Sequence, residues 1–390
     1  MACILFITAL YPQSDNQSRM EKTFALHNFV KYWVDDNIIV IKPIKIKKKE
    51  FHRFFQIEKR NVGNVLVYLI PYFRQEYLSF FFRFHLYHLL KKLNIHPDII
   101  VSHYKTSHIF GRQIALKFGI PLICGIHVTD INCIKANNSS GKKISTAIVS
   151  ANVVACRSFQ IKRKLLELLP PHSVDKKLFV VNSGIAEKHI RSKDFFLEKT
   201  NKEEFPALIT VSTLKARKHI DNAIKAFGHL SPMFSSYTIV GGGPVFNSLV
   251  TLSKKIDTED KIQFVGHVDS SQVFPMLINP QIFLLVSSNE TFGLVYLEAM
   301  AYGCIVIGLK NEGIDGIIVD GENGFLCPDP SVASIEHILR KVLSLTQQEK
   351  KKILMNARNT ILMHTEQSAG LRYRKLIQQA MDAHFYENKA

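Results

Sequence analysis

The sequence predicts an α/β protein with two Rossmann-like, doubly wound domains, and three observations favour this fold. The chain has 390 residues, which is more than one ordinary hydrophobic core organises. Its composition is 46% hydrophobic and 21% charged, so each domain can bury a sizeable core. Short, almost wholly apolar runs alternate with amphipathic segments, which is typical of parallel strands covered by helices on both faces.

The first half of the chain begins with an apolar strand, CILFITALY (residues 3–11), and a helix is expected from near Ser18 through residue 33. Further strands and helices are expected, in order, at residues 64–72, 72–93, 97–103, 108–119, 120–127 and 152–158. This alternation predicts an N-terminal domain over residues 1–190.

A charged stretch that ends in proline, RSKDFFLEKTNKEEFP (residues 191–206), is the expected linker. The alternation restarts after it and predicts a C-terminal domain over residues 207–370. Its elements are expected at residues 207–213, 220–230, 236–243, 245–256, 262–268, 271–278, 282–288, 304–310 and 316–328, with helices from Ser331 onward. A final helix at residues 371–390 could pack back on the N-terminal domain. Ligands of such folds bind beyond the carboxyl ends of the strands, so we expect a cleft between two facing domains.

Simple patterns disfavour several classes of protein. The six cysteines show neither metal-ligand nor redox spacing, which indicates buried thiols in a reducing compartment. The N-terminus has no basic stretch before its short apolar run, which indicates a first strand and not a signal peptide. No segment approaches the roughly 18 uninterrupted apolar residues that a membrane-spanning helix needs. We therefore expect a cytoplasmic protein.

Positive charge is concentrated in the first half. Residues 1–190 hold 28 Lys and Arg against 12 Asp and Glu, whereas residues 191–390 hold 22 against 21. Aromatic residues and leucines mix with cations at residues 72–93, after a basic run at residues 41–55. A helix of this composition could lie on an anionic membrane surface, or it could be a core helix with a solvated basic edge. Nucleic acid is another polyanion, but no zinc-finger, RNP or basic-zipper pattern occurs, so no nucleic-acid partner is predicted.

Two carboxylates stand eight residues apart in NETFGLVYLEAMAYG, residues 289–303. Glu290 would lie in the loop after a strand and Glu298 about two helical turns later, which separates them by about a dozen ångströms. A hydrolytic carboxylate pair works at ~5–10 Å, so this pair is better suited to gripping hydroxyl groups at two ends of an extended ligand. Gly293, near the helix N-terminus, would let a phosphate approach free backbone N–H groups. These features favour a nucleotide sugar, and two ordinary surface glutamates are the alternative.

The same segment resembles the E-x7-E motif of the GT-B retaining glycosyltransferases of family 4, the glycosyltransferase group 1 domain. The resemblance continues in order through YTIVGGGP (residues 237–244), IQFVGHV (262–268) and EGIDGIIVDGENGFL (312–326). It covers most of residues 200–370 well and the first half loosely. It implies that residues 1–190 form the acceptor domain and residues 207–370 the nucleotide-sugar-binding domain.

The resemblance also implies roles for individual residues. Glu290 would hydrogen-bond the sugar hydroxyls in the catalytic site, and we do not expect it to act as a nucleophile. Glu298 would bind the ribose, and the backbone amides around Gly293 would face the sugar and phosphate. The further donor-binding candidates are Phe292, Gly293, Leu294, Gly243 and Val268.

The segment VSTLKARKHID (residues 211–221) resembles the one in which an Arg and, five residues later, a Lys hold the donor phosphates. Lys218 matches that Lys and would stabilise the leaving diphosphate, with a solvated lysine at a helix start as the alternative. Thr213 stands where the Arg is expected. Arg217 or Lys215 could supply the missing charge.

In the first half, GIHVTDI (residues 125–131) resembles the family's H-x-x-D stretch, so His127 would contact the donor sugar or its neighbouring backbone. A structural histidine at a strand end is the alternative. The glycine-rich loop that many members carry after the first strand is replaced by YPQSDNQSR (residues 11–19). No D-x-D or other divalent-metal ligand set is found, so we expect no metal and no cofactor besides the co-substrate, a UDP- or GDP-sugar.

We therefore predict a retaining, metal-independent glycosyltransferase. It would move a sugar from a nucleotide donor to a lipid-linked saccharide in cell-surface polysaccharide or glycolipid biosynthesis. Its partners would be the nucleotide sugar, the lipid-linked acceptor and the anionic surface of the inner face of the plasma membrane. Because of Thr213 and the missing glycine-rich loop, the alternative is a catalytically inactive GT-B-like protein that binds a nucleotide or polysaccharide.

Overall fold

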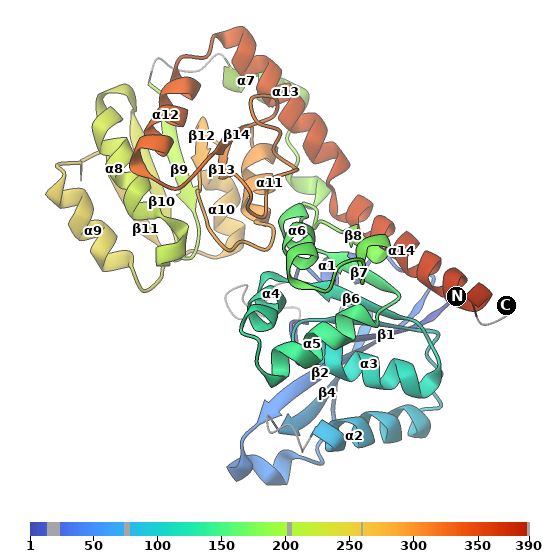
Figure 1. Ribbon diagram of the computed structural model, residues 1–390. Coiled ribbons are helices and arrows are strands. Elements are labelled where there is room, and N and C mark those ends of the chain that lie inside the picture. Colours follow the sequence, from blue (N-terminus) through green and yellow to red (C-terminus); the bar gives the residue numbers. More distant parts are fainter. Residues whose placement is uncertain (14–23, 74–78, 201–204, 259, 388–390) are drawn as a thin grey trace. The chain divides into compact units, whose positions relative to one another are not determined.

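The computed structural model describes residues 1–13, 24–73, 79–200, 205–258 and 260–387. The chain divides into two compact units, each with its own sheet (Figure 1). Unit 1 comprises residues 1–157, 161–182 and 369–390, and unit 2 comprises residues 158–160 and 183–368. Both units are α/β, which confirms the predicted Rossmann-like fold class. The main division falls after Asn182, eight residues before the expected end of the N-terminal domain.

The sheet of unit 1 has eight strands in the order β3-β4-β2-β1-β5-β6-β7-β8. All neighbours are parallel except β3 and β4, which form an antiparallel pair at one edge. The strands are β1 (Cys3–Thr8), β2 (Asn37–Ile46), β3 (Glu58–Val62), β4 (Val65–Phe73), β5 (Ile99–His103), β6 (Leu122–Ile126), β7 (Val153–Cys156) and β8 (Leu178–Val180).

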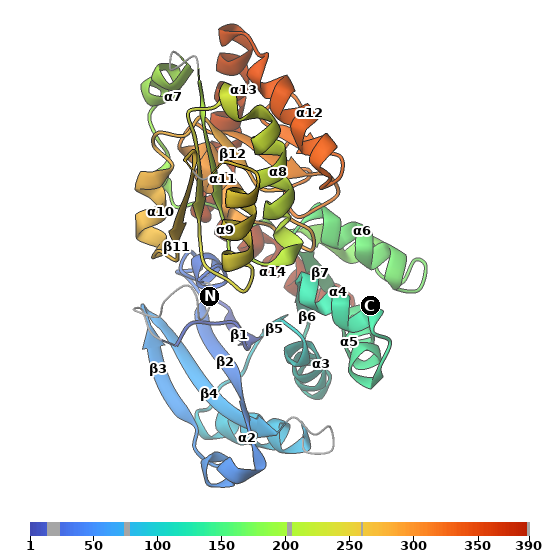
Figure 2. The ribbon, with the colours of Figure 1, turned by 90° about the vertical axis from the view of Figure 1, so that its left-hand side faces the viewer.

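Apolar side chains leave both faces of this sheet, because successive residues of a strand point to opposite sides. Leu5 and Ile7 enter one hydrophobic cluster, whereas Ile4 and Phe6 enter another. The helical elements include α1 (His27–Val30), η1 (Lys48–Arg53), α2 (Ser79–Lys92), α3 (Thr106–Phe118), α4 (Val128–Lys135), α5 (Ser139–Val149) and α6 (Phe159–Leu168). Of these, α2 lies along β4 (Figure 2). The early part of the helix expected from Ser18 lies outside the described residues.

Strand β2 was not among the expected strands, and Pro43 interrupts its apolar run. Proline cannot donate to a sheet ladder and is usually confined to edges. The structure resolves the conflict: β1 pairs with β2 only as far as Ile41, so the proline stands beyond that ladder. On its other side Pro43 lies opposite Ile70 of β4.

The sheet of unit 2 has six parallel strands in the order β11-β10-β9-β12-β13-β14. The chain fills one side of β9 first and then crosses to the other side with β12. The strands are β9 (Ala207–Val211), β10 (Ser236–Val240), β11 (Ile262–Gly266), β12 (Ile282–Leu284), β13 (Ile305–Leu309) and β14 (Phe325–Cys327). The helices are α8 (Ile220–Leu230), α9 (Phe246–Lys255), α10 (Ser270–Met276), α11 (Leu294–Ala301), α12 (Val332–Leu343) and α13 (Gln347–Met363).

The expected linker packs against unit 2, and the last helix of the chain packs against unit 1. The expected linker contains α7 (Lys193–Thr200), whose Phe196 is fully buried in the core of unit 2. The last helix, α14 (Glu366–Glu387), belongs to unit 1 from Ala369 onward. Its Gly370 carbonyl accepts from Nε1 of Trp33 at 2.9 Å, and the Tyr373 ring is buried in a core of unit 1.

Candidate active site

The carboxyl ends of β9 and β12 meet at the point where the strand order of unit 2 reverses. These two strands are direct neighbours, with Ile209 opposite Phe283. Loops after adjacent strands that lead to opposite sides of a parallel sheet leave a crevice in which such folds bind ligands. The loop after β9 leads to Lys218, and the loop after β12 leads to Glu290. The fold therefore brings together two residues that different motifs predicted.

Lys218 and Glu290 form a close ion pair. Nζ of Lys218 lies 2.5 Å from Oε2 of Glu290, which also accepts from Oγ of Ser287 at 3.2 Å. The two side chains are only 8% and 17% exposed. Burial lowers the pKa of Lys218 below its usual 10.5, and the charge of Glu290 opposes this shift. Burial alone would raise the pKa of Glu290, but Lys218 and Arg217 outweigh it and lower that pKa below 4.5.

Arg217 adds a second positive charge beside Glu290. Its Nη1 lies 3.5 Å from Oε2 of Glu290 and donates to the Ser288 carbonyl at 3.0 Å. The backbone of Ser288 donates back to the Arg217 carbonyl at 2.9 Å, so the two loops are tied together. Thr213, which replaces the expected Arg, lies exposed earlier in the same loop, and Lys215 is exposed as well. Of the two candidates for the missing charge, Arg217 is the one placed at Glu290.

Gly293 forms the turn from this loop into α11. It is the N-cap residue of the helix and has a left-handed backbone with φ of +84°. A Cβ atom there would lie 2.6 Å from the ring of Tyr296, which is buried and donates its hydroxyl to the Leu285 carbonyl at 2.5 Å. Glycine thus permits both the turn and the close packing. The first N–H groups of α11 open at this turn, where a helix offers unpaired donors to an anion.

The other donor-binding candidates of this segment lie around the same turn. Phe292 is buried at 4% exposure, and Leu294 is partly buried. Glu298 is partly buried within α11, so it stands on the helix that Gly293 begins. Its role as the ribose ligand stays a prediction.

Glu312 is a site residue that the sequence interpretation did not single out. Its Oε2 accepts the backbone N–H of Glu290 at 3.1 Å. The following Gly313 packs so closely that a Cβ atom would meet the Phe292 nitrogen at 2.7 Å. The loop after β13 therefore supports the loop that carries Glu290. The signal was present, since EGIDG begins the last segment that resembles the family, but a glutamate that binds a backbone N–H has no distinctive spacing.

Three more predicted positions lie at the carboxyl ends of neighbouring strands. The loop that holds Thr213 packs on the glycine run after β10, because Leu214 donates its N–H to the Gly242 carbonyl at 2.9 Å. A Cβ atom on Gly243 would meet the Leu214 carbonyl oxygen at 2.2 Å. Val268 follows β11 and packs partly buried against a core cluster. These positions share one edge of the sheet with Lys218 and Glu290, as parallel strands require.

His127 belongs to unit 1, where it follows β6 and is the N-cap residue of α4. Its Nε2 lies 3.1 Å from Nδ1 of His103, whose Nε2 lies 2.8 Å from the Tyr373 hydroxyl. Burial, together with the charge of Arg157, lowers the pKa of His127 to about 3 although Asp130 opposes the shift, so the ring is neutral. A neutral imidazole can donate to or accept from a sugar hydroxyl. Contact with the donor stays a prediction.

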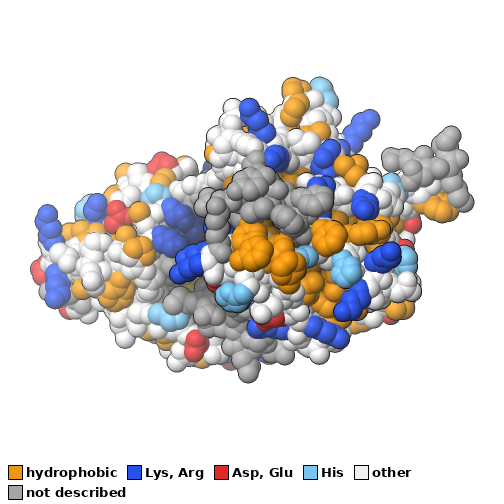
Figure 3. Space-filling model, turned by 90° about the horizontal axis from the view of Figure 1, so that it is seen from below, with side chains coloured by type: hydrophobic (Ala, Val, Ile, Leu, Met, Phe, Trp, Pro, Cys, Tyr) orange, Lys and Arg blue, Asp and Glu red, His pale blue; other side chains and the backbone are white. Residues whose placement is uncertain are grey.

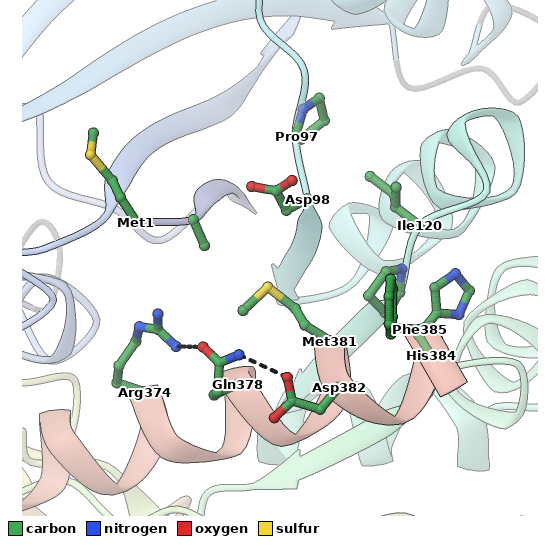
Figure 4. Close-up of a pocket in the computed structure, with 12 residues that line it drawn as sticks. Met1, Pro97, Asp98, Ile120, Arg374, Gln378, Met381, Asp382, His384 and Phe385 are labelled. Carbon is green, nitrogen blue, oxygen red and sulfur yellow. Dashed lines mark hydrogen bonds between the residues drawn. The ribbon is translucent and has the colours of Figure 1, made fainter. Parts of the chain in front are cut away.

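Other features of the described residues involve none of these positions. A pocket of about 670 Å³ in unit 1 is bordered by the start of the chain, Asp98 and the end of α14 (Figure 4). Along its α14 wall, Arg374 donates to Gln378 at 3.1 Å, and Gln378 donates to Asp382 at 2.9 Å. The described side chains include no group of three or more His, Cys, Asp or Glu residues arranged for a metal ion. None of the described helices combines the length and apolar character needed to cross a bilayer.

Both halves of the chain match known protein families. Residues 192–360 match the family described as glycosyl transferases group 1, and residues 43–188 match glycosyltransferase family 4. The N-acetyl-alpha-D-glucosaminyl L-malate synthase of Bacillus anthracis is 30% identical over 237 residues, which cover 59% of this chain and 61% of that protein. A glycogen synthase of Mycobacterium tuberculosis is 25% identical over 273 residues, which cover 65% and 63%. The matches thus span less than two thirds of these relatives.

Solved structures share the fold over almost the whole chain. HepE of Anabaena, in complex with UDP and glucose, has a TM-score of 0.70 at 16% identity and covers 97% of this chain and 100% of its own. Sucrose-phosphate synthase from Thermosynechococcus elongatus has a TM-score of 0.74 at 15% identity and covers 98% and 100%. At these identities the likeness concerns the fold alone.

Proposed function

We propose that this chain, which belongs to the GT-B glycosyltransferases of the family 4 type, transfers a sugar from a nucleotide sugar to a saccharide acceptor with retention of configuration. One observation carries the proposal. A buried lysine, a partly buried glutamate and the glycine-capped N-terminus of α11 converge at the switch point of the unit 2 sheet. This combination offers positive charge for a diphosphate and a carboxylate for sugar hydroxyls.

The proposed chemistry uses the charge that builds up on the leaving group. As the bond between the anomeric carbon and the diphosphate breaks, negative charge develops on the departing oxygen. Lys218, Arg217 and the first amides of α11 stabilise that charge, so the proposal needs no metal ion. The acceptor oxygen bonds to the anomeric carbon on the face from which the diphosphate leaves, and a phosphate oxygen takes the acceptor proton.

Glu290 serves as an anchor in this proposal. Its carboxylate already accepts from Lys218 and Ser287, and Arg217 stands 3.5 Å away. These partners hold its charge and reduce its tendency to attack carbon. A carboxylate so held is suited to orient sugar hydroxyls, which positions the anomeric carbon for the acceptor.

The proposed acceptor is a lipid-linked saccharide at an anionic membrane surface, and the proposed donor is a UDP- or GDP-sugar. The excess of positive charge in residues 1–190 supports the membrane part, since cations attract anionic headgroups. His127, neutral and at the carboxyl end of β6, is the unit 1 residue proposed to contact the donor sugar.

The donor is identified by thermal-shift measurements against a panel of UDP-, GDP- and ADP-sugars. A ligand at 100 times its dissociation constant raises the free energy of unfolding by about 2.7 kcal/mol. We expect one nucleotide series to stabilise the wild-type protein and not the Lys218→Ala variant. A panel in which no nucleotide sugar shifts the melting temperature would refute the proposal.

Turnover separates the proposed enzyme from the binding protein that Thr213 suggests as the alternative. The stabilising donor, labelled in its sugar, is incubated with a lipid extract, and transfer is scored as label in the organic phase. The anomeric proton coupling of the product then reports retention or inversion. Stabilisation by a donor without any transfer or donor hydrolysis would favour the inactive binding protein.

A further inference from the structure

Three phenylalanine rings project from unit 1 into solvent close together. Phe51 of η1 is 58% exposed, Phe55 just after η1 is 71% exposed, and Phe84 of α2 is 57% exposed. The Phe51 and Phe55 rings meet edge to face with their centroids 6.2 Å apart. The centroid of the Phe55 ring lies 5.8 Å from that of His85, which is the sequence neighbour of Phe84. These three residues are called the aromatic surface below. Exposed large apolar groups that gather in one place mark an interaction site.

A buried base holds these rings in place. Beneath η1, the side chains of Ile46, Phe54 and Phe73 form a small core of their own. The Phe51 ring is nearly parallel to the rings of Phe54 and of Phe73, which ends β4. The centroid separations are 5.9 Å and 6.0 Å. The Phe51 ring is therefore anchored to the sheet, so less ordering is needed there when a partner binds.

Positive charge surrounds the aromatic surface. Residues 43–60 hold seven Lys and Arg against two Asp and Glu, and residues 79–93 hold three against none. The two carboxylates, Glu50 and Glu58, both lie within 4.0 Å of Arg53, which offsets their charge. Figure 3 shows hydrophobic side chains gathered on this face with Lys, Arg and His around them. The exposed lysines of the segments that carry these rings are Lys45, Lys47, Lys49, Lys91 and Lys92.

We infer that the aromatic surface inserts into an anionic lipid bilayer while the surrounding lysines contact the headgroups. Aromatic rings on one face and lysines around them are the combination that binds such an interface. A protein partner of matching size would have to supply many carboxylates, whereas an anionic membrane supplies negative charge over its whole surface. Each added cation strengthens such binding roughly fivefold.

The inferred membrane contact differs from the one considered from the sequence, in which a whole helix within residues 72–93 lies on the membrane. Helix α2 buries Phe82, Leu86 and Leu90 in the core of unit 1, so it is a core helix with one exposed edge. The short η1 segment, which follows β2, and the residues just after it contribute two of the three rings. The aromatic surface thus extends the membrane part of the proposed function to a specific site.

The position of this site fits an acceptor that arrives by the membrane, and this step rests on the proposed function. Strand β2 ends at the same edge of the parallel sheet as β6, after which His127 stands. The two strands are three strand spacings apart, about 14 Å. Because β2 runs about four residues beyond the level of Gly125 before η1 begins, a lipid-linked saccharide at the aromatic surface would have to reach back along this edge to meet the donor sugar.

Flotation with vesicles tests the role of the rings. The probes are phosphatidylcholine vesicles with and without phosphatidylglycerol, and neither nucleotide nor acceptor is added. The test variant replaces Phe51, Phe55 and Phe84 by serine, and the matched control replaces three exposed phenylalanines elsewhere, Phe179, Phe205 and Phe385. We expect the test variant to lose more than about tenfold in affinity for phosphatidylglycerol vesicles and the control to bind like wild type.

A second pair of variants tests the charge. Lys47, Lys49, Lys91 and Lys92 are changed to glutamine, and the control makes the same change at four exposed lysines of unit 2, Lys254, Lys255, Lys351 and Lys352. Both lose four positive charges. Only the first should bind the two vesicle compositions equally, because it alone loses charges from the segments that carry the rings.

The results that would overturn the inference are distinct from those that concern the enzyme. Equal vesicle binding by wild type and the serine variant would overturn it, as would equal losses in test and control variants. If the serine variant instead dissociates a wild-type dimer in sedimentation velocity, the surface is a contact between copies and the inference falls. Nucleotide-sugar binding by thermal shift is measured in parallel, so failure of the proposed function would show there and leave the vesicle result unaffected.

Discussion

Nζ of Lys218 donates to Oε2 of Glu290 at 2.5 Å, although the two residues are 72 positions apart in the sequence. One was predicted from a phosphate-binding segment and the other from a sugar-binding segment. Each therefore sets the position and charge of the other. Replacing either one changes both the phosphate-binding and the sugar-binding side of the proposed site.

Lys218→Ala should lower kcat/KM for sugar transfer by about 10²–10³-fold, because it removes a positive donor from the developing negative charge. Lys255→Ala, at an exposed lysine of the same unit, is the control and should leave kcat/KM unchanged. Initial rates over a range of donor concentrations check both. Because the residues act together, the loss in a Lys218→Ala, Glu290→Gln double variant should be smaller than the product of the two single losses. Wild-type rates in Lys218→Ala would remove this residue from the site.

Glu290→Gln should also lower stability at neutral pH, because the Lys218 side chain is only 8% exposed and its ammonium loses its charged partner. We expect a loss of about 3 kcal/mol in chemical denaturation. The Glu290 pKa is lowered in the folded protein, so its contribution is present above pH 4.5 and is lost as pH falls through the folded pKa. The gap between wild type and variant should therefore narrow below pH 4.5. Glu322→Gln, at an exposed glutamate, should show neither effect, and a gap that persists in acid would contradict the assigned pairing.

Much of the fold could be predicted because strand and helix periods are local properties. The apolar composition of the runs that form β5, β6 and β9 is enough to predict them as buried strands. Strand β2 could not be predicted in this way. Pro43 is acceptable in it because the ladder with β1 has already ended at Ile41, and the end of that ladder depends on a partner strand elsewhere in the chain. Helix α7 was hidden in a charged stretch, because its burial rests on few residues, Phe196 among them.

The site was predictable where a motif carries it and not where a contact completes it. Lys218, Glu290 and Gly293 belong to segments whose order is visible in the sequence. Glu312 accepts a hydrogen bond from the backbone N–H of Glu290, and Arg217 lies close to the Glu290 carboxylate. Both contacts depend on how loops after different strands meet. Such contacts form only at the folded edge of the sheet, so no spacing of residues in the sequence predicts them.

Arg217 should prove to be the replacement for the arginine that is missing at Thr213. Its guanidinium stands 3.5 Å from Glu290, whereas Lys215 is exposed in the same loop. Arg217→Ala is therefore expected to weaken nucleotide-sugar affinity about tenfold or more, and Lys215→Ala to change it little. Titration calorimetry with the donor found in the thermal-shift panel measures both. A larger loss in the lysine variant would reverse the assignment.

His127 should make the protein sensitive to mild acid. Its pKa is about 3 in the folded protein against 6.5 ordinarily, mainly through burial, with Arg157 and His108 adding to the shift and Asp130 opposing it. The neutral ring contributes stability that is complete above pH 6.5 and is lost progressively as pH falls toward 3. His127→Gln should therefore lose less stability between pH 7 and pH 5 than wild type does in urea denaturation. Identical pH slopes would show that another group dominates.

Gly293→Ala tests whether the turn into α11 needs glycine for its backbone or for the space. The position has φ of +84°, and an added Cβ would lie 2.6 Å from the buried Tyr296 ring. Gly321 has φ of +77° with nothing within 4 Å, so Gly321→Ala carries the backbone strain alone. We expect Gly321→Ala to cost about 1 kcal/mol and Gly293→Ala about 1–3 kcal/mol more, both measured by urea denaturation. Because Tyr296 cannot move without breaking its bond to the Leu285 carbonyl, the clash should displace the loop that carries Glu290. Donor affinity should then fall in Gly293→Ala and stay unchanged in Gly321→Ala, and equal stability losses in the two variants would show that packing against Tyr296 does not constrain the turn.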